Sequence, residues 1–131
     1  MKKDRVINPD IISAIAALGH TEFCCISDCG LPIPHGVSVV DVSVTSMVPN
    51  FISVLEAVVS ELVVESYICA SEIETENPAT MKKIQALLTD KPAQKIPHEE
   101  FKTLVAKAKF VIRTGETSPY ANVILVGGVN F

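Results

Sequence analysis

The chain has 131 residues, of which 48% are hydrophobic and 20% are charged, which is typical of one folded domain and not of a disordered segment. A formal net charge of −4, with no basic stripe, argues against binding to nucleic-acid phosphates. No apolar run approaches the roughly 20 residues of a membrane span, and Asn8-Pro9-Asp10 interrupts the N-terminal apolar stretch, so we expect a cytoplasmic protein without a signal peptide.

The first half of the chain predicts two helices and three strands. Asn8-Pro9 offers a side-chain acceptor and then a proline suited to the first helical turn, and Gly19 is placed to end that helix. Pro49-Asn50 starts another helix with an apolar face that extends to Leu62. Apolar and β-branched runs predict strands at residues 23–27, 38–44 and 63–70. Glycines and prolines predict a loop at residues 30–36.

The second half continues the alternation of helices and strands. Asn77-Pro78 repeats the cap signature and predicts a helix to about Leu88, and residues 98–108 predict another. Short apolar runs predict strands at residues 94–96, 110–113 and 123–126. We therefore expect an α/β fold, a three-layer α/β/α sandwich around a mainly parallel mixed sheet, in one domain over residues 1–131.

Polar residues follow several of the expected strands. They are Asp28, Ser71, Glu72, His98, Arg113, Thr114 and Glu116, and a loop of residues 118–122 comes after them. In open α/β sheets, ligands bind beyond the carboxyl ends of the strands. The sequence therefore predicts a ligand site at this edge of the sheet.

The four cysteines, Cys24, Cys25, Cys29 and Cys69, contain no C-x-x-C pair and no zinc-ligand spacing, so we expect no metal site. Cys24 and Cys25 lie within an apolar strand and are expected to behave as small buried hydrophobes. A hydrolase that uses Cys29 with His20 or His98 is one alternative, but no sequence feature activates this thiol.

A histidine can shuttle protons near neutral pH, and His20 is a candidate for that role. The alternative is a surface histidine near a helix C-terminus. Asp28 lies at the other end of the intervening strand, so the two residues meet only if loops fold back or a neighbouring subunit supplies one of them. His98 can instead mark a helix start, Asp28 can be a turn former, and Tyr120 and Asn122 can anchor their own loop.

Several segments together resemble the D-ribose pyranase and fucose mutarotase family. The matching segments are Leu18-Gly19-His20-Thr21, Ser27-Asp28-Cys29-Gly30-Leu31-Pro32-Ile33-Pro34, His98-Glu99-Glu100-Phe101, Val111-Ile112-Arg113-Thr114-Gly115-Glu116 and Ser118-Pro119-Tyr120-Ala121-Asn122. The similarity spans nearly the whole chain, and the joint occurrence of the segments is far more specific than any one of them. The histidine at 98 and the alanine before Asn122 look like the ribose branch.

The resemblance implies a function and a set of site residues. It implies a mutarotase that interconverts the pyranose and furanose forms of D-ribose, with no metal and no organic cofactor. His20 is then the catalytic acid, and the sugar is held by Asp28, His98, Tyr120, Ala121 and Asn122. The family also implies a ring-shaped homo-oligomer, a decamer of two stacked pentamers. A mean hydropathy of +0.36 fits a chain with apolar surface left to cover.

Two further alternatives use the same hydroxyl-binding residues. A fucose mutarotase differs only in the sugar that it accepts. A non-catalytic sugar-binding module that assists uptake needs no proton shuttle. The general base for ring opening is not identified by the sequence.

Overall fold

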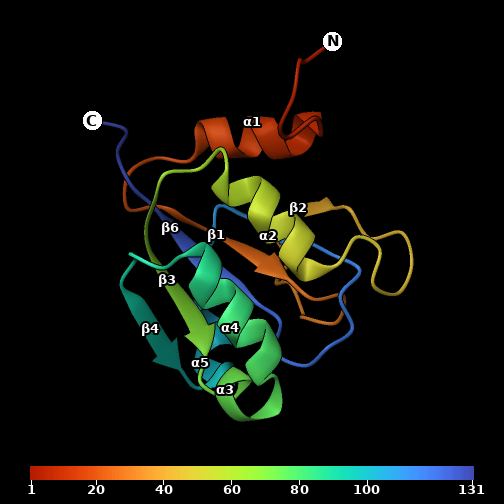
Figure 1. Ribbon diagram of the computed structural model, residues 1–131, viewed down its shortest axis with the longest axis vertical. Coiled ribbons are helices and arrows are strands. Elements are labelled where there is room, and N and C mark those ends of the chain that lie inside the picture. Colours follow the sequence, from red (N-terminus) through yellow and green to blue (C-terminus); the bar gives the residue numbers. More distant parts are fainter.

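A six-stranded mixed sheet forms the centre of the computed structural model, which describes residues 1–131 (Figure 1). The strands lie in the order β2 (Ser38–Asp41), β5 (Phe110–Arg113), β1 (Phe23–Ser27), β6 (Val123–Gly127), β3 (Val64–Ala70) and β4 (Ala93–Ile96). The helices are α1 (Pro9–Ala17), α2 (Phe51–Val59), α3 (Ile73–Glu76), α4 (Pro78–Leu87) and α5 (His98–Val105). None of them has the length and hydrophobicity needed to cross a membrane.

One strand runs against all the others. β6 pairs antiparallel with β1 and with β3, whereas β5 is parallel to β1 and β2, and β4 is parallel to β3. The mainly parallel mixed sheet that the sequence predicts is thus confirmed. The carboxyl ends of β1, β3, β4 and β5 lie at one edge of the sheet, and because β6 is reversed, the loop that leads into it lies at that same edge.

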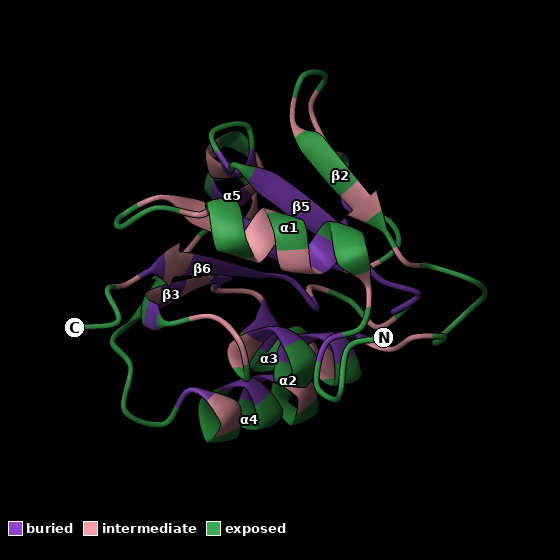
Figure 2. Ribbon diagram, turned by 90° about the horizontal axis from the view of Figure 1, so that it is seen from above, coloured by how far each residue is buried: buried purple, intermediate pink, exposed green.

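Helices cover both faces of the sheet, which gives the expected α/β/α layers. Alternate residues of each strand point to opposite faces, so Cys24 and Ile26 contact the larger core, whereas Cys25 faces the smaller one. The larger core packs against α1, α2, α3 and α4, and the smaller core packs against α5. Figure 2 shows β5 and β6 as largely buried, whereas the edge strand β2 is mostly exposed.

Two of the three expected helix caps form as the sequence predicts. The Asn8 side chain accepts hydrogen bonds from the N–H groups of Asp10 and Ile11, both at 3.0 Å, and Asn50 accepts one from Ser53 at 2.9 Å. Asn77 differs, because its side chain makes no cap bond to α4. Its amide donates instead to the loop before β6, which ties α4 to that loop.

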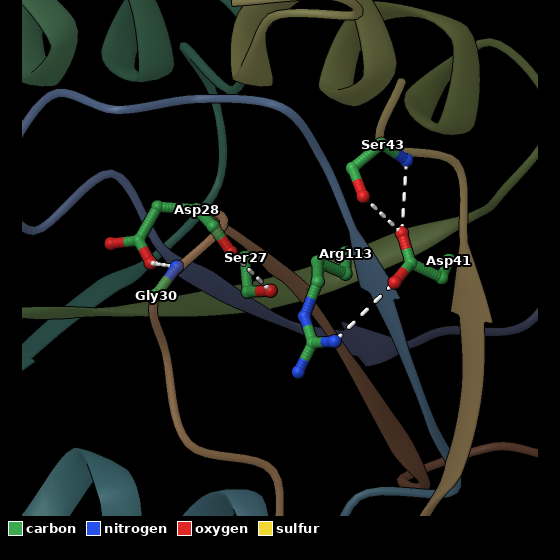
Figure 3. A network of polar contacts seen from close by, with 6 residues as sticks. All are labelled: Ser27, Asp28, Gly30, Asp41, Ser43 and Arg113. Atoms are coloured by element: carbon green, nitrogen blue, oxygen red, sulfur yellow. Dashed lines mark hydrogen bonds and ion pairs between the residues drawn. The ribbon is translucent and has the colours of Figure 1, made fainter. Parts of the chain in front are cut away.

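The second strand is shorter than predicted. The expected strand over residues 38–44 ends at Asp41, because its partner β5 ends at Arg113, directly beside it. Beyond this point the Asp41 carboxylate accepts hydrogen bonds from Ser43 and from the Arg113 guanidinium (Figure 3). The short helix α3 was not predicted by the sequence, because four residues hold too few apolar positions to display helical spacing.

Candidate active site

A pocket of about 340 Å³ lies at the edge where the parallel strands end. Three segments line it: residues 28–32 after β1, His98 at the start of α5, and residues 116–120 between β5 and β6. The structure therefore brings Asp28, His98 and Tyr120 together, although they are far apart in the chain. A hollow thus lies at the carboxyl edge of the sheet, where the sequence predicts a ligand site.

Hydrogen bonds on both carboxylate oxygens fix Asp28. Oδ1 accepts from the N–H groups of Gly30 at 2.9 Å and Leu31 at 2.8 Å, and the first of these bonds is visible in Figure 3. Oδ2 accepts from Nδ2 of Asn122 at 2.9 Å. Asp28 is thus both the turn former and a pocket residue, so the two interpretations of the sequence are compatible. A carboxylate held in this way keeps one orientation toward a ligand.

Asn122 and Ala121 are fully buried and do not line the pocket with their side chains. Both polar atoms of the Asn122 amide bind Asp28: Nδ2 donates to the carboxylate, and Oδ1 accepts the Asp28 main-chain N–H at 2.9 Å. Ala121 packs in the larger core. The exposed fraction is 0% for each whole residue, main chain included, so neither reaches the surface of the pocket, and their contact with a sugar stays a prediction.

Aromatic contacts hold the rings of His98 and Tyr120 beside each other. The two ring centroids lie 5.0 Å apart and meet edge to face, and Phe101 stacks on His98 at 6.4 Å. Tyr120 has a positive φ of 56°, an uncommon backbone for a non-glycine residue, which turns the chain just before β6. Strained backbone of this kind is often found at ligand sites.

Glu116 and Glu72 hold the segments of the pocket in place. From the sequence alone, both were notable only as polar residues that follow a strand. Glu116 is 4% exposed, and its oxygens accept the N–H groups of Phe51 at 3.0 Å and Ser118 at 3.1 Å. Burial alone raises the pKa of Glu116, but hydrogen bonds from Phe51, Ser118 and Thr117 outweigh burial and hold that pKa below its ordinary value. Glu72 accepts the N–H of His98. Only contacts across the fold reveal these roles.

His20 lies outside this pocket within the single chain. It precedes β1, whereas Asp28 follows β1, and five residues of extended strand at about 3.3 Å each separate them by roughly 16 Å. Its Nε2 lies 3.2 Å from Oε1 of Glu65, and 49% of its side chain is exposed. His20 borders a separate hollow of about 540 Å³ together with apolar side chains that include Leu62, Val63 and Phe131.

The cysteines divide into a buried set and one exposed thiol. Cys24, Cys25 and Cys69 are buried, as the sequence predicts for the first two, and burial raises the pKa of Cys24 and of Cys69 to about 12 and that of Cys25 well above its ordinary value. Cys29 is exposed on the rim of the pocket. No three histidine, cysteine or acidic side chains gather closely enough to hold a metal ion.

Known proteins resemble this chain over its full length. A protein named D-ribose pyranase from Geobacillus thermodenitrificans is 49% identical over 131 residues, which cover 100% of this chain and 99% of that protein. A D-ribose pyranase from Halalkalibacterium halodurans is 48% identical over 100% of both chains. A solved structure of Bacillus subtilis RbsD complexed with D-ribose is 41% identical, covers 100% of both chains and superposes with a TM-score of 0.97.

A more distant structure shares the fold alone. FucU from Bifidobacterium longum is 20% identical, covers 95% of this chain and 97% of its own, and has a TM-score of 0.82. The model of the RbsD / FucU transport protein family matches residues 1–130. The chain therefore belongs to the RbsD / FucU transport protein family.

Proposed function

We propose that this protein has D-ribose pyranase activity and interconverts the pyranose and furanose forms of D-ribose. The observation that carries this proposal is the pocket, in which a fixed carboxylate, an imidazole and a phenol converge at the carboxyl edge of the sheet. Relatives named D-ribose pyranase, 42–49% identical over all 131 residues, support the same activity. Hydroxyl groups need donors and acceptors in fixed positions, and these three side chains supply both.

The reaction needs only proton transfers. Opening the ring breaks the bond between the anomeric carbon and the ring oxygen. An acid protonates that oxygen while a base removes the proton of the anomeric hydroxyl. The free aldehyde then rotates, and attack by the C5 hydroxyl gives the pyranose, whereas attack by the C4 hydroxyl gives the furanose. On closure the acid regains a proton from the attacking hydroxyl, and the base returns its proton to the aldehyde oxygen, which becomes the new anomeric hydroxyl. The proton transfers therefore balance without a metal or an organic cofactor.

In this proposal His20 is the proton donor, and Asp28, His98 and Tyr120 hold the sugar hydroxyls. Ala121 and Asn122 complete the binding loop, and Asn122 acts on the sugar through the Asp28 carboxylate that it holds. Because His20 and the pocket lie at opposite ends of β1, a neighbouring protomer must bring its own His20 to the pocket.

The surroundings of His20 support a contact between copies of the chain. Val63, Val129 and Phe131 border the same hollow and are 42%, 37% and 100% exposed. Apolar side chains gathered around a functional residue are typical of an interface. We further propose that the assembly is a ring-shaped homodecamer of two stacked pentamers that acts in the cytoplasm on D-ribose.

Saturation-transfer NMR on D-ribose tests the activity and the role of His20 together. The wild-type protein should accelerate exchange between the anomers, and His20→Ala should lose about 10²–10⁴-fold of that acceleration, the usual contribution of a positioned acid. His35→Ala, in an exposed loop, is the matched control and should retain the wild-type rate.

The same assay separates the alternatives. Ribose binding without faster exchange would make the protein a sugar-binding module, and preferential exchange of L-fucose would make it a fucose mutarotase. A His20→Ala protein as fast as the wild type would remove His20 from the mechanism.

A further inference from the structure

Helix α5 begins at His98 without a capping side chain of its own. The residue before it is Pro97, whose side chain makes no cap hydrogen bond. The first N–H groups of an α-helix have no partner within the helix and need an acceptor from elsewhere. The position of His98 therefore depends on what the rest of the fold offers to its N–H.

Glu72 supplies that acceptor from the end of the neighbouring strand. Its two carboxylate oxygens lie 3.1 and 3.0 Å from the His98 nitrogen, and both accept its N–H. The parallel pairing of β3 with β4 brings the two segments together. The N–H of Ser71, just beyond β3, donates at 2.8 Å to the carbonyl oxygen of Ile96, the last residue of β4.

Glu72 is itself held in place. The Ser71 hydroxyl donates to its Oε1 at 2.9 Å. Burial alone raises the pKa of Glu72, but the hydrogen bonds from His98 and Ser71 outweigh burial and hold that pKa below its ordinary value. Glu72 is thus an ionised acceptor at neutral pH, and hydrogen bonds to a charged acceptor are stronger than those to a neutral one.

No hydrogen bond within the chain fixes the His98 ring. Its Nδ1 is buried without a partner, and the ring touches Tyr120 and Phe101 only through aromatic contacts. Functional histidines are commonly oriented by a hydrogen bond on the second ring nitrogen. Here the main-chain anchor at Glu72 is the polar contact that sets where the imidazole stands.

We propose that Glu72 is a positioning residue, which fixes His98 in the pocket by holding its main-chain N–H. This inference rests on the proposed function, in which His98 grips a sugar hydroxyl. That grip is made in both the ground state and the transition state. Loss of the anchor should therefore weaken ribose binding and raise KM, whereas kcat should change little.

Substitutions of Glu72 test the anchor by ribose exchange measured over a range of ribose concentrations. Glu72→Ala should raise KM about three- to tenfold, the loss expected for one hydrogen bond, with kcat within about twofold. Glu72→Gln keeps a carbonyl acceptor for the His98 N–H and should restore KM to within about twofold of the wild-type value. Glu76→Ala removes an exposed acidic residue from the adjoining helix α3 and should leave KM unchanged.

A double-mutant cycle separates positioning from a general structural effect. In a His98→Ala background there is no imidazole to position, so adding Glu72→Ala should leave KM unchanged while any loss of thermal stability remains. Equal effects of Glu72→Ala on KM with and without His98 would overturn the proposal. So would a Glu72→Gln protein as impaired as Glu72→Ala, because the negative charge and not the acceptor would then matter.

The NMR signals of the His98 ring test the anchor without ribose. Tyr120 lies against the ring, so the His98 ring protons should have shifts displaced from those of a free histidine. Glu72→Ala should move these shifts toward the free values, and Glu76→Ala should not. Unchanged shifts in Glu72→Ala would overturn the positioning role even if the wild type exchanges ribose. If the wild-type protein does not accelerate ribose exchange, the proposed function is refuted. The chemical shifts of the His98 ring protons then still test whether Glu72 positions His98.

Discussion

At the scale of single residues, hydrogen bonds from Asn122 hold the pocket residue Asp28 in place. The Asn122 amide donates to the Asp28 carboxylate and accepts the Asp28 main-chain N–H, each at 2.9 Å, across a separation of 94 residues. Asn122 is fully buried, so in the proposed site it would act on a ligand through the Asp28 carboxylate that it holds. The amide is suited to this place because it donates to the carboxylate and accepts from the main chain at once.

Replacing Asn122 by alanine should therefore affect both stability and ribose binding. The free energy of unfolding should fall by about 1–3 kcal/mol, because Asp28 N–H and Oδ2 lose their partner. Ribose affinity should fall as well, since the carboxylate is no longer held. Chemical denaturation and ribose titration measure the two effects. Asn8→Ala, which removes the cap of α1, should lower stability alone, and an unchanged affinity in Asn122→Ala would contradict the supporting role.

The thiols should differ in reactivity as their burial differs. Only the thiolate reacts with alkylating agents, and burial holds the pKa of the Cys24 and Cys69 thiols near 12. Mass spectrometry of the native protein after iodoacetamide treatment should show one alkylated site per chain, at Cys29, and four sites in denaturant. Modification of Cys24, Cys25 or Cys69 without denaturant would contradict the buried arrangement.

Several site residues could be predicted from the sequence, and others could not. Asp28 directly follows β1, and His98 comes two residues after β4 ends, so the rule that ligands bind at the carboxyl ends of strands predicts both. The support from Glu72 and Glu116 is made across 26 and 65 residues of sequence, and no local pattern encodes which main-chain N–H a carboxylate will reach. The burial of Asn122 also depends on the position of β6 at the centre of the sheet.

At the scale of elements, Glu116 joins the loop before β6 to helix α2. Its side chain accepts the first N–H of α2 and the N–H of Ser118, while its main-chain oxygen accepts the N–H of Cys29 at 2.9 Å. One buried residue thus connects two of the three segments that line the pocket. Its negative charge also lies at the N-terminus of α2, where the helix dipole favours it.

This arrangement should contribute stability that disappears in acid. The pKa of Glu116 is lower in the folded protein than its ordinary value of 4.5, so folding favours the ionised form. The contribution is fully present above pH 4.5 and is lost as the pH falls through the lowered folded pKa. The side chain of Glu116→Gln does not titrate. Thermal unfolding should therefore show that this variant is less stable than the wild type at pH 7 and that the difference shrinks toward pH 3. A deficit that is constant with pH would contradict the role of the charge.

The elements themselves were largely predictable, because most carry local signals. Residues 23–27 form β1 with the bounds that their apolar run indicates, and Asn8-Pro9 starts α1 as expected. The direction of β6 was not predictable from its own residues, since an apolar run reads the same in both orientations. The second strand ends early because β5 ends, which is a property of the partner and not of residues 42–44.

At the scale of the whole molecule, the two halves of the proposed site lie at opposite ends of β1. A mixture of two inactive chains tests whether neighbours share a site. His20→Ala and Asp28→Ala chains, co-refolded in equal amounts, should regain activity at about a quarter of the sites, because random assembly unites an intact pocket with an intact His20 that often. A mixture of His20→Ala with His20→Gln should regain none. Failure of the first mixture, with both variants folded and assembled, would contradict the sharing of sites between protomers.

In the proposed assembly each chain would supply its His20 to one neighbour and receive the His20 of another in its own pocket, because the two lie at opposite ends of the protomer. An open row of such chains would leave one His20 without a pocket at one end and one pocket without a His20 at the other end. A closed ring, or a two-fold pair in which each chain supplies His20 to the other, has no free ends, so every pocket receives a His20. If neighbours share sites in this way, the distance along a single strand links the number of working sites to the closure of the assembly.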